Sequence, residues 1–310
     1  MANVSAWDLN EISVEEQMGL FGEGDVNLKL IAQHCRADLE VRDNRVWVSD
    51  AARKAQVAGI FDDLHAIYGM KKHIETADVS ALLNNGNDKD EYKQPIATGY
   101  GQRHFYLRSA GQRQLYQAFA DHDITFAIGP AGTGKTFLAV VYACNLLKKG
   151  TIRKIIITRP VVEAGESLGF LPGDLKEKID PYLRPIYDAL ELLFGLPGVE
   201  RLMEKGQLEI APLAYMRGRT LDEACVILDE AQNTTGMQIK MFMTRLGFGS
   251  QMIITGDITQ IDLPYPKKSG LVEAMDIVKG IPEIAVVEMG RRDVVRHPVV
   301  QKIIDAYEGR

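Results

Sequence analysis

The stretch ITFAIGPAGTGKTFLAVVYACNLLKK, residues 124–149, decides the fold of this chain. A short apolar run is followed by a glycine-rich segment and then by a helical pattern. The glycines let backbone N–H groups close around phosphate oxygens, and a helix N-terminus adds the positive end of its dipole. A fortuitous glycine-rich turn would not need both flanks. The pattern therefore predicts a phosphate-binding loop of Gly129, Pro130, Ala131, Gly132, Thr133, Gly134, Lys135 and Thr136.

Working outward from this loop, further apolar runs alternate with helical patterns. They are KIIIT (154–158), CVILD (225–229), QMIIT (251–255) and IAVVE (284–288). Alternating strands and helices predict an α/β domain with a mostly parallel sheet. The predicted fold class is a P-loop NTPase domain of the RecA-like kind. In such a domain Lys135 is expected to reach the β- and γ-phosphates of a nucleotide, and Thr136 to ligate Mg²⁺.

The segment VILDEAQN, residues 226–233, runs from a buried strand straight into two acids. Two carboxylates there are costly unless something pairs with them. In a P-loop domain the end of a neighbouring strand faces Mg²⁺. Asp229 is therefore the predicted metal carboxylate, and Glu230 is the predicted general base that takes a proton from the attacking water. An adjacent Glu favours hydrolysis over transfer to a bound acceptor.

Two glutamines are further candidates. Gln260 ends the segment ITGDITQ (254–260), which is expected to lie beside the other motifs and to report on the γ-phosphate. Gln112 lies 17 residues before Gly129. Its amide both donates and accepts, so it is a candidate reader of the adenine edge, and a plain surface glutamine is the alternative that stays open.

The first part of the chain differs in charge from the rest. Residues 1–100 carry 10 Lys and Arg against 17 Asp and Glu, whereas residues 101–310 carry 26 against 25. Neither part shows the basic excess of a simple nucleic-acid binder.

There is no membrane-length apolar run or signal peptide, so a cytoplasmic protein without membrane contact is expected. Cys35, Cys144 and Cys225 are expected to be reduced and buried.

The organisation of residues 1–102 is predicted from local patterns. Residues 1–17 are expected to form a loose acidic tail. A helix, a hairpin about Asp43-Asn44 and a second helix closed by Gly69 then make a small α+β unit. The predicted boundaries are a tail and α+β domain over 1–83, a linker over 84–102, and the P-loop domain over 103–310.

The motifs together resemble the motor core of superfamily 1 helicases. The stretch TRPVVEAGESLGFLPGDLKEKIDPYLRPIYDAL (158–190), with RGRTLDEACVILDEAQN and RRDVVRHPVV, further resembles the PhoH-like ATPases of the YbeZ type. The α+β domain within residues 1–83, called the front module below, resembles that family's KH-like module. The resemblance implies binding and hydrolysis of ATP with Mg²⁺, action on RNA and a ring-forming tendency. It also implies work beside a YbeY-like endoribonuclease in RNA and ribosome maturation.

The front module departs from the pattern that RNA binding needs. KH modules clamp the RNA backbone with a G-x-x-G loop. The corresponding turn here is Gly22-Glu23-Gly24-Asp25, which carries two acids where phosphates would approach. A protein-docking or assembly role is therefore preferred for this module.

Arginines are the remaining candidates. Only about 50 residues follow the last motif, too few for a second motor domain, so a neighbouring subunit in a homo-oligomeric ring is expected to complete the site. Candidates for an arginine acting in trans are Arg245, Arg291, Arg292 and Arg296, each with a surface cation as its alternative. By resemblance, the candidates for contact with single-stranded RNA are Arg159, Arg217 and Arg219, and pairing with Glu163, Glu166 or Asp222 is the alternative.

Two other functions compete with an RNA-directed ATPase. A small-molecule phosphotransferase is disfavoured by Glu230 beside Asp229 and by Gln260. A nucleotide-gated scaffold that docks an endoribonuclease through the acidic front, without helicase action, stays open.

Overall fold

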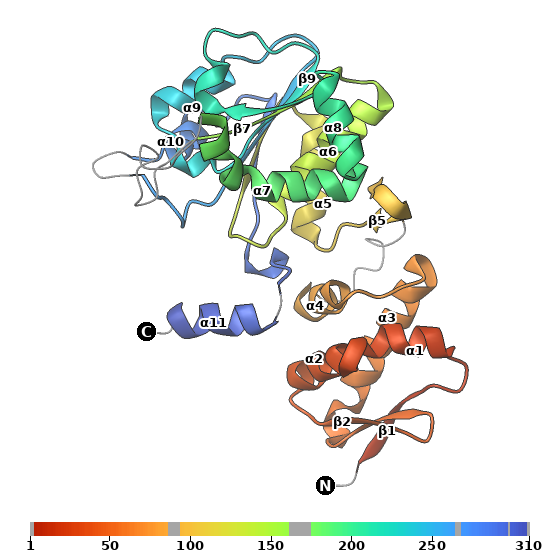
Figure 1. The fold of residues 1–310 in the computed structure, drawn as a ribbon. Helices are drawn as coiled ribbons and strands as arrows, with labels where there is room; N and C mark the ends of the chain where they lie inside the picture. The colour runs from red at the N-terminus through yellow and green to blue at the C-terminus, as the bar shows by residue number, and fades with distance from the viewer. Residues whose placement is uncertain (1–2, 86–93, 161–174, 264–267, 297, 309–310) are drawn as a thin grey trace. The chain divides into compact units, whose positions relative to one another are not determined.

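A computed structural model describes residues 3–85, 94–160, 175–263, 268–296 and 298–308. Two compact units make up the chain (Figure 1). Unit 1 combines residues 1–95 with 106–110 and 292–310, and unit 2 combines residues 96–105 with 111–291. The C-terminal residues thus group with the front of the chain, whereas the sequence placed them in the P-loop domain.

A six-stranded parallel sheet forms the centre of unit 2 (Figure 1). Its spatial order is β11-β6-β10-β9-β7-β8, and all its strand pairings are parallel. The strands are β6 (Ile124–Ile128), β7 (Lys154–Arg159), β8 (Leu208–Pro212), β9 (Ala224–Leu228), β10 (Gln251–Gly256) and β11 (Ile284–Glu288). The α/β prediction is confirmed, because each predicted apolar run forms a strand. β8 was not predicted, since it is only partly buried and is an outer strand of the sheet.

Helices cover both faces of this sheet (Figure 1). They are α5 (Ala110–Asp121), α6 (Lys135–Lys149), α7 (Leu175–Phe194), α8 (Leu196–Glu204), α9 (Gly236–Met243) and α10 (Gly270–Ile277). On one face, Phe126 and Val226 pack in one apolar cluster with Phe242 of α9 and Leu271 of α10. The inner strands β6, β7, β9 and β10 are buried on both faces, which explains why they read as continuous apolar runs.

Unit 1 contains a three-stranded antiparallel sheet of order β1-β3-β2. Its strands are β1 (Val4–Asp8), β2 (Leu39–Arg42) and β3 (Arg45–Val48). Its helices are α1 (Val14–Phe21), α2 (Val26–Cys35), α3 (Lys54–Lys71), α4 (Thr76–Asn85) and α11 (Pro298–Glu308). Leu20, Ile31, Val46 and Phe61 are fully buried in its core. The turn of residues 22–25 lies between α1 and α2, and the KH-like identity of this unit stays a prediction.

Several local predictions for the front need correction. The acidic tail over residues 1–17 is wrong, because β1 pairs with β3 and α1 begins at Val14. Apolar side chains between the acids, such as the buried Leu9, supply the anchoring. α3 continues past Gly69 and ends at Lys71, with Lys72 in the left-handed region at φ 61°. The hairpin about Asp43-Asn44 is confirmed, with φ of 51° and 53° at these residues.

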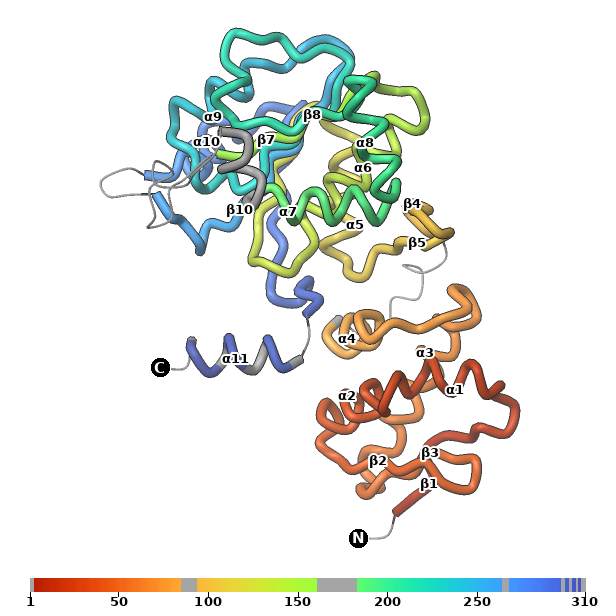
Figure 2. The backbone as a smooth tube through the Cα atoms, viewed as in Figure 1, coloured from red at the N-terminus to blue at the C-terminus, as the bar shows by residue number. Residues whose placement is uncertain are grey.

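The predicted linker, 84–102, is more structured than expected at its end. Residues 86–93 lie outside the described part of the chain. Beyond them, β4 (Ala97–Thr98) pairs with β5 (His104–Phe105) in a small ribbon (Figure 2).

The three cysteines are buried and free, as predicted. Within the described ranges, no helix is both long and apolar enough to cross a bilayer.

Candidate nucleotide-binding site

The glycine-rich loop joins the end of β6 to the start of α6, as the sequence predicted. Gly132 and Gly134 have φ of 89° and 85°, a region that side chains other than glycine rarely adopt. The Lys135 side chain folds back into the loop, where Nζ donates to the carbonyl oxygens of Gly129 (2.6 Å) and Pro130 (2.9 Å). The loop therefore places an ammonium group among the backbone N–H groups that suit phosphate.

Thr136 and Asp229 meet at the carboxyl end of the sheet. Thr136 Oγ1 donates to Asp229 Oδ1 at 2.7 Å, and Thr255 Oγ1 donates to the same oxygen at 2.6 Å. Asp229 is only 3% exposed. Mg²⁺ prefers oxygen ligands and is commonly held by one or two carboxylates with waters and substrate phosphates. Thr136 and Asp229 fit that ion, and they are the residues that would hold it.

Glu230 has a strained backbone and an engaged side chain. Its φ of 55° puts a non-glycine residue in the left-handed region. Oε2 accepts a hydrogen bond from Gln232 Nε2 at 2.5 Å. Oε1 lies 3.3 Å from Arg159 Nη2, and Arg159 Nη1 lies 4.0 Å from Asp229 Oδ2. The predicted base and a predicted RNA arginine are therefore brought together.

Gln232 and Asp257 connect three motifs, a role that the sequence did not reveal. Gln232 is 1% exposed, and its Oε1 accepts from the backbone N–H of Asp257 at 3.0 Å. Asp257 Oδ2 in turn accepts from the backbone N–H of Ala131 in the glycine-rich loop at 3.2 Å. The only signal was the place of these residues beside the recognised motifs. A continuous set of hydrogen bonds thus runs from the loop to Glu230.

The two predicted glutamines have different surroundings. Gln112 is 6% exposed, and its Nε2 donates to the Thr133 carbonyl at 3.0 Å, so the surface alternative is wrong. Its adenine role stays a prediction. Gln260 is exposed in the turn after β10, where its backbone N–H donates to the Asp257 carbonyl at 3.1 Å. Asp257 contacts the loop, and the γ-phosphate role of Gln260 stays a prediction.

The structure does not gather the predicted arginines at one place. Arg245 donates to the carbonyl oxygens of Met241 (3.1 Å) and Arg219 (3.0 Å). Its own carbonyl accepts from Leu221, which precedes β9, whereas Asp229 follows that strand. Arg245 therefore lies near the amino end of β9, whereas Asp229 lies at its carboxyl end. Within this chain Arg245 does not reach the site.

Arg219 pairs with a neighbour instead of facing the site. Its guanidinium makes two hydrogen bonds to the Glu209 carboxylate, of 2.6 and 2.7 Å, and these hold the pKa of Glu209 below its usual value. Arg217 is exposed. Among the predicted alternatives, Asp222 accepts from the Phe248 N–H at 2.8 Å, and Glu163 and Glu166 lie outside the described residues.

The other arginine candidates follow β11. Arg291 and Arg292 are exposed in a short 3₁₀ turn, and Arg296 is half-buried beyond it. Met289, at the end of β11, donates its N–H to the Ile128 carbonyl at 2.7 Å. A Cβ atom on Gly129 would come within 2.6 Å of the Met289 carbonyl, so this segment packs directly against the glycine-rich loop.

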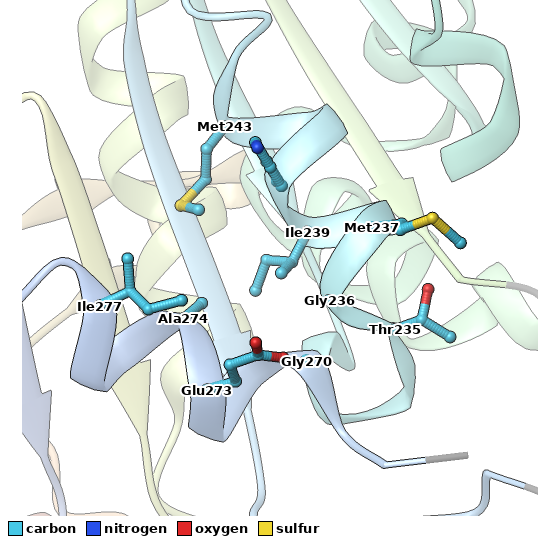
Figure 3. Close-up of a pocket in the computed structure, with 10 residues that line it drawn as sticks. Thr235, Gly236, Met237, Ile239, Met243, Gly270, Glu273, Ala274 and Ile277 are labelled. Atoms are coloured by element: carbon cyan, nitrogen blue, oxygen red, sulfur yellow. The ribbon is translucent and has the colours of Figure 1, made fainter.

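A groove lies between α9 and α10 (Figure 3). Its volume is about 650 Å³, and Met237, Ile239, Met243 and Ile277 supply much of its apolar lining. Met237 and Ile277 are largely exposed. The Gly270 N–H donates to the Thr234 carbonyl at 2.7 Å, which joins the start of α10 to the turn that carries Glu230.

Known proteins resemble this chain closely in sequence. A family model described as PhoH-like protein matches residues 105–308. A PhoH-like protein of Bacillus subtilis is 51% identical over 301 residues, covering 95% of this chain and 94% of the relative. One from Synechocystis is 46% identical, covering 96% and 92%. Among solved structures, the large terminase of a thermophilic bacteriophage has 12% identity and a TM-score of 0.42, covering 63% of this chain and 49% of its own.

Proposed function

Because the chain belongs to the PhoH-like protein family, we propose that its nucleotide-binding P-loop fold hydrolyses ATP with Mg²⁺ and couples hydrolysis to RNA. The observation that carries this proposal is the 2.7 Å hydrogen bond between Thr136 and Asp229, with Glu230 next in the chain. It combines a phosphate-binding loop, a fitting pair of metal ligands and a candidate base at one edge of the sheet.

The chain's own residues supply the chemistry around the nucleotide. Backbone N–H groups of the glycine-rich loop and Lys135 bind the phosphates, and Thr136 with Asp229 would hold the metal. Bound Mg²⁺ would neutralise charge that develops on the phosphate oxygens. Glu230 takes a proton from the attacking water, and Gln232 orients its carboxylate. Gln112, buried against the loop, is the candidate contact for the adenine.

RNA is the proposed effector because of the family and the position of Arg159. This arginine ends β7 at the edge of the sheet that carries Asp229, and its side chain is 23% exposed. Guanidinium groups suit phosphate. The proposed setting is RNA and ribosome maturation in the cytoplasm beside a YbeY-like endoribonuclease, with the acidic front as its docking unit.

A homo-oligomeric ring is proposed to complete the ATP site. A head-to-tail contact that closes makes a ring, and an arginine from the neighbour can then stabilise the transition state. Candidates are Arg245, Arg291, Arg292 and Arg296. Mixing a Lys135→Ala chain with each arginine variant should restore activity for the correct one. If no pair regains activity at any ratio, the arginine does not act in trans.

Steady-state ATP hydrolysis with and without single-stranded RNA tests the proposed function. Wild type is expected to turn over with Mg²⁺ and to be stimulated severalfold by RNA, and Glu230→Gln is expected to be inactive. Glu223→Gln is a matched control, because Glu223 is an exposed acid that pairs with Arg153 at 2.9 Å. Glu230-dependent turnover that ignores RNA would instead favour the nucleotide-gated scaffold. Turnover that survives Glu230→Gln would contradict the proposed chemistry.

A further inference from the structure

The Glu230 carboxylate faces donors on both sides. Oε2 accepts from Gln232 Nε2 at 2.5 Å, and Oε1 lies 3.3 Å from Arg159 Nη2. A general base must present an oxygen to the water that it deprotonates. In this arrangement each oxygen faces a donor of the chain itself. The two donors fix the orientation of the carboxylate, although its side chain is 36% exposed, so withdrawal of one donor lets Glu230 turn toward the attacking water.

The two partners differ in how exposed their side chains are to solvent. Gln232 is 1% exposed and is fixed at its other end by the Asp257 N–H, 3.0 Å from Oε1. Arg159 is the last residue of β7, and its side chain is 23% exposed. It also lies 4.0 Å from Asp229, a longer contact than a direct hydrogen bond. Arg159 is therefore the partner that a ligand from solution can reach.

The chemistry of Arg159 defines that ligand. A guanidinium fork matches phosphate oxygens as well as carboxylate oxygens, so a phosphate group competes directly with Glu230 for it. Arg159 lies beside Asp229, the candidate metal ligand, at the carboxyl ends of the strands. Its side chain is partly exposed, so a phosphate group in solution can reach it. Gln232 would keep its bond to Glu230 Oε2 and leave Oε1 to face water.

From this geometry we propose that Arg159 is a positioning residue that restrains Glu230, and that a backbone phosphate of single-stranded RNA releases Glu230 by pairing with Arg159. The inference rests on the proposed function, because it explains how RNA would raise ATP turnover. The same phosphate chemistry is present in ATP itself, and the two sources are separated by the test.

The test is steady-state ATP hydrolysis by the full chain, with and without a single-stranded oligouridylate, for wild type and Arg159→Ala. The variant is expected to raise kcat in ATP alone by roughly fivefold or more, the lower end of coupling between sites. It should leave KM for ATP unchanged and abolish further stimulation by the oligonucleotide. Structural damage would lower kcat, not raise it.

Two further variants test whether the effect is specific to Arg159 and acts through Glu230. Arg153→Ala is the matched control, because Arg153 precedes the other end of β7 and pairs with the exposed Glu223. It should not change the rate. Arg159→Ala combined with Glu230→Gln should be inactive, which shows that the gain passes through Glu230.

Three outcomes would overturn the inference. An unchanged or lower kcat of Arg159→Ala in ATP alone would show that Arg159 does not restrain Glu230. A raised KM for ATP without a gain in kcat would assign Arg159 to the nucleotide phosphates. A gain in kcat together with intact RNA stimulation would remove RNA as the releasing ligand. If wild type itself ignores RNA, the proposed function fails, whereas the restraint of Glu230 is still decided by the ATP-only rates.

Discussion

Thr136 and Asp229 are 93 residues apart in the chain, yet the hydroxyl of one donates to the carboxylate of the other at 2.7 Å. The contact exists because β6 and β9 both lie next to β10 in the sheet, one on each side of it. Thr255 at the end of β10 donates to the same Asp229 oxygen. The start of α6 and the ends of β9 and β10 thus define one cluster of oxygen atoms that suits a small divalent cation.

Removing the Thr136 hydroxyl is expected to weaken the metal's hold on the site. Thr136→Ala should lower kcat by at least roughly 100-fold, because a bound metal supplies several kcal/mol of transition-state stabilisation. It should also raise the Mg²⁺ concentration that gives half-maximal turnover. Thr136→Ser keeps the hydroxyl and should retain most activity. Equal losses in the Ser and Ala variants would contradict a ligand role for this oxygen.

Gln232 is expected to orient Glu230 rather than to bind ATP. Gln232→Ala removes the 2.5 Å hydrogen bond to Glu230 and leaves the buried N–H of Asp257 without its acceptor. We expect kcat to fall roughly 10- to 100-fold with little change in KM, and stability to drop by about 1–3 kcal/mol. Gln117→Ala, at an exposed glutamine on α5, is the control. A change in KM alone would assign Gln232 to nucleotide binding.

The inner strands of the parallel sheet, β6, β7, β9 and β10, were predictable because they are buried on both faces and so carry unbroken apolar runs. β8 escaped prediction because only Leu208 and Ala211 along it are buried, which leaves no clear pattern. β1 escaped because it is a short strand followed by an acidic segment, and its partner β3 lies far along the chain. Local patterns carry no information on such pairing.

Those parts of the site that lie within one sequence motif were predictable. Contacts between motifs were not, because they depend on which strands lie side by side. The glycine-rich loop and the strand that precedes Asp229 follow from local sequence. The pairing of Arg159 with Glu230 requires β7 to lie beside β9, and the contact from Gln232 to Asp257 requires β10 on the other side. The position of Arg245 near the amino end of β9 also follows only from the folded chain.

The pairing of Glu209 with Arg219 should make a pH-dependent contribution to stability. The hydrogen bonds from Arg219 lower the pKa of Glu209, so the folded state favours the ionised carboxylate. This contribution is fully present above the unfolded pKa, near 4.3, and is lost as pH falls through the lower folded pKa. Glu209→Gln should therefore reduce Tm at pH 7, and the difference from wild type should shrink below about pH 4. A difference that does not depend on pH would contradict the ion pair.

Unit 1 contains a buried ion network around Asp78. Asp78 is fully buried, and its carboxylate accepts from Lys71 Nζ (2.5 Å), Arg108 Nε (3.1 Å) and the Glu75 N–H (2.9 Å). Arg108 also pairs with the Glu75 side chain. Removing one partner of a buried pair leaves uncompensated charge, so Asp78→Ala should cost about 3–5 kcal/mol in the free energy of unfolding.

This cost can be measured on unit 1 within the whole chain. Both tryptophans, Trp7 and Trp47, belong to unit 1, so their fluorescence during urea unfolding reports on that unit. Glu40→Gln is the control, because Glu40 is exposed and pairs with the exposed Arg42 at 3.8 Å, so this change should alter stability by less than about 1 kcal/mol. A similarly small effect of Asp78→Ala would show that Lys71 and Arg108 find other compensation, and the network would then not be what holds α4 to residues 106–110.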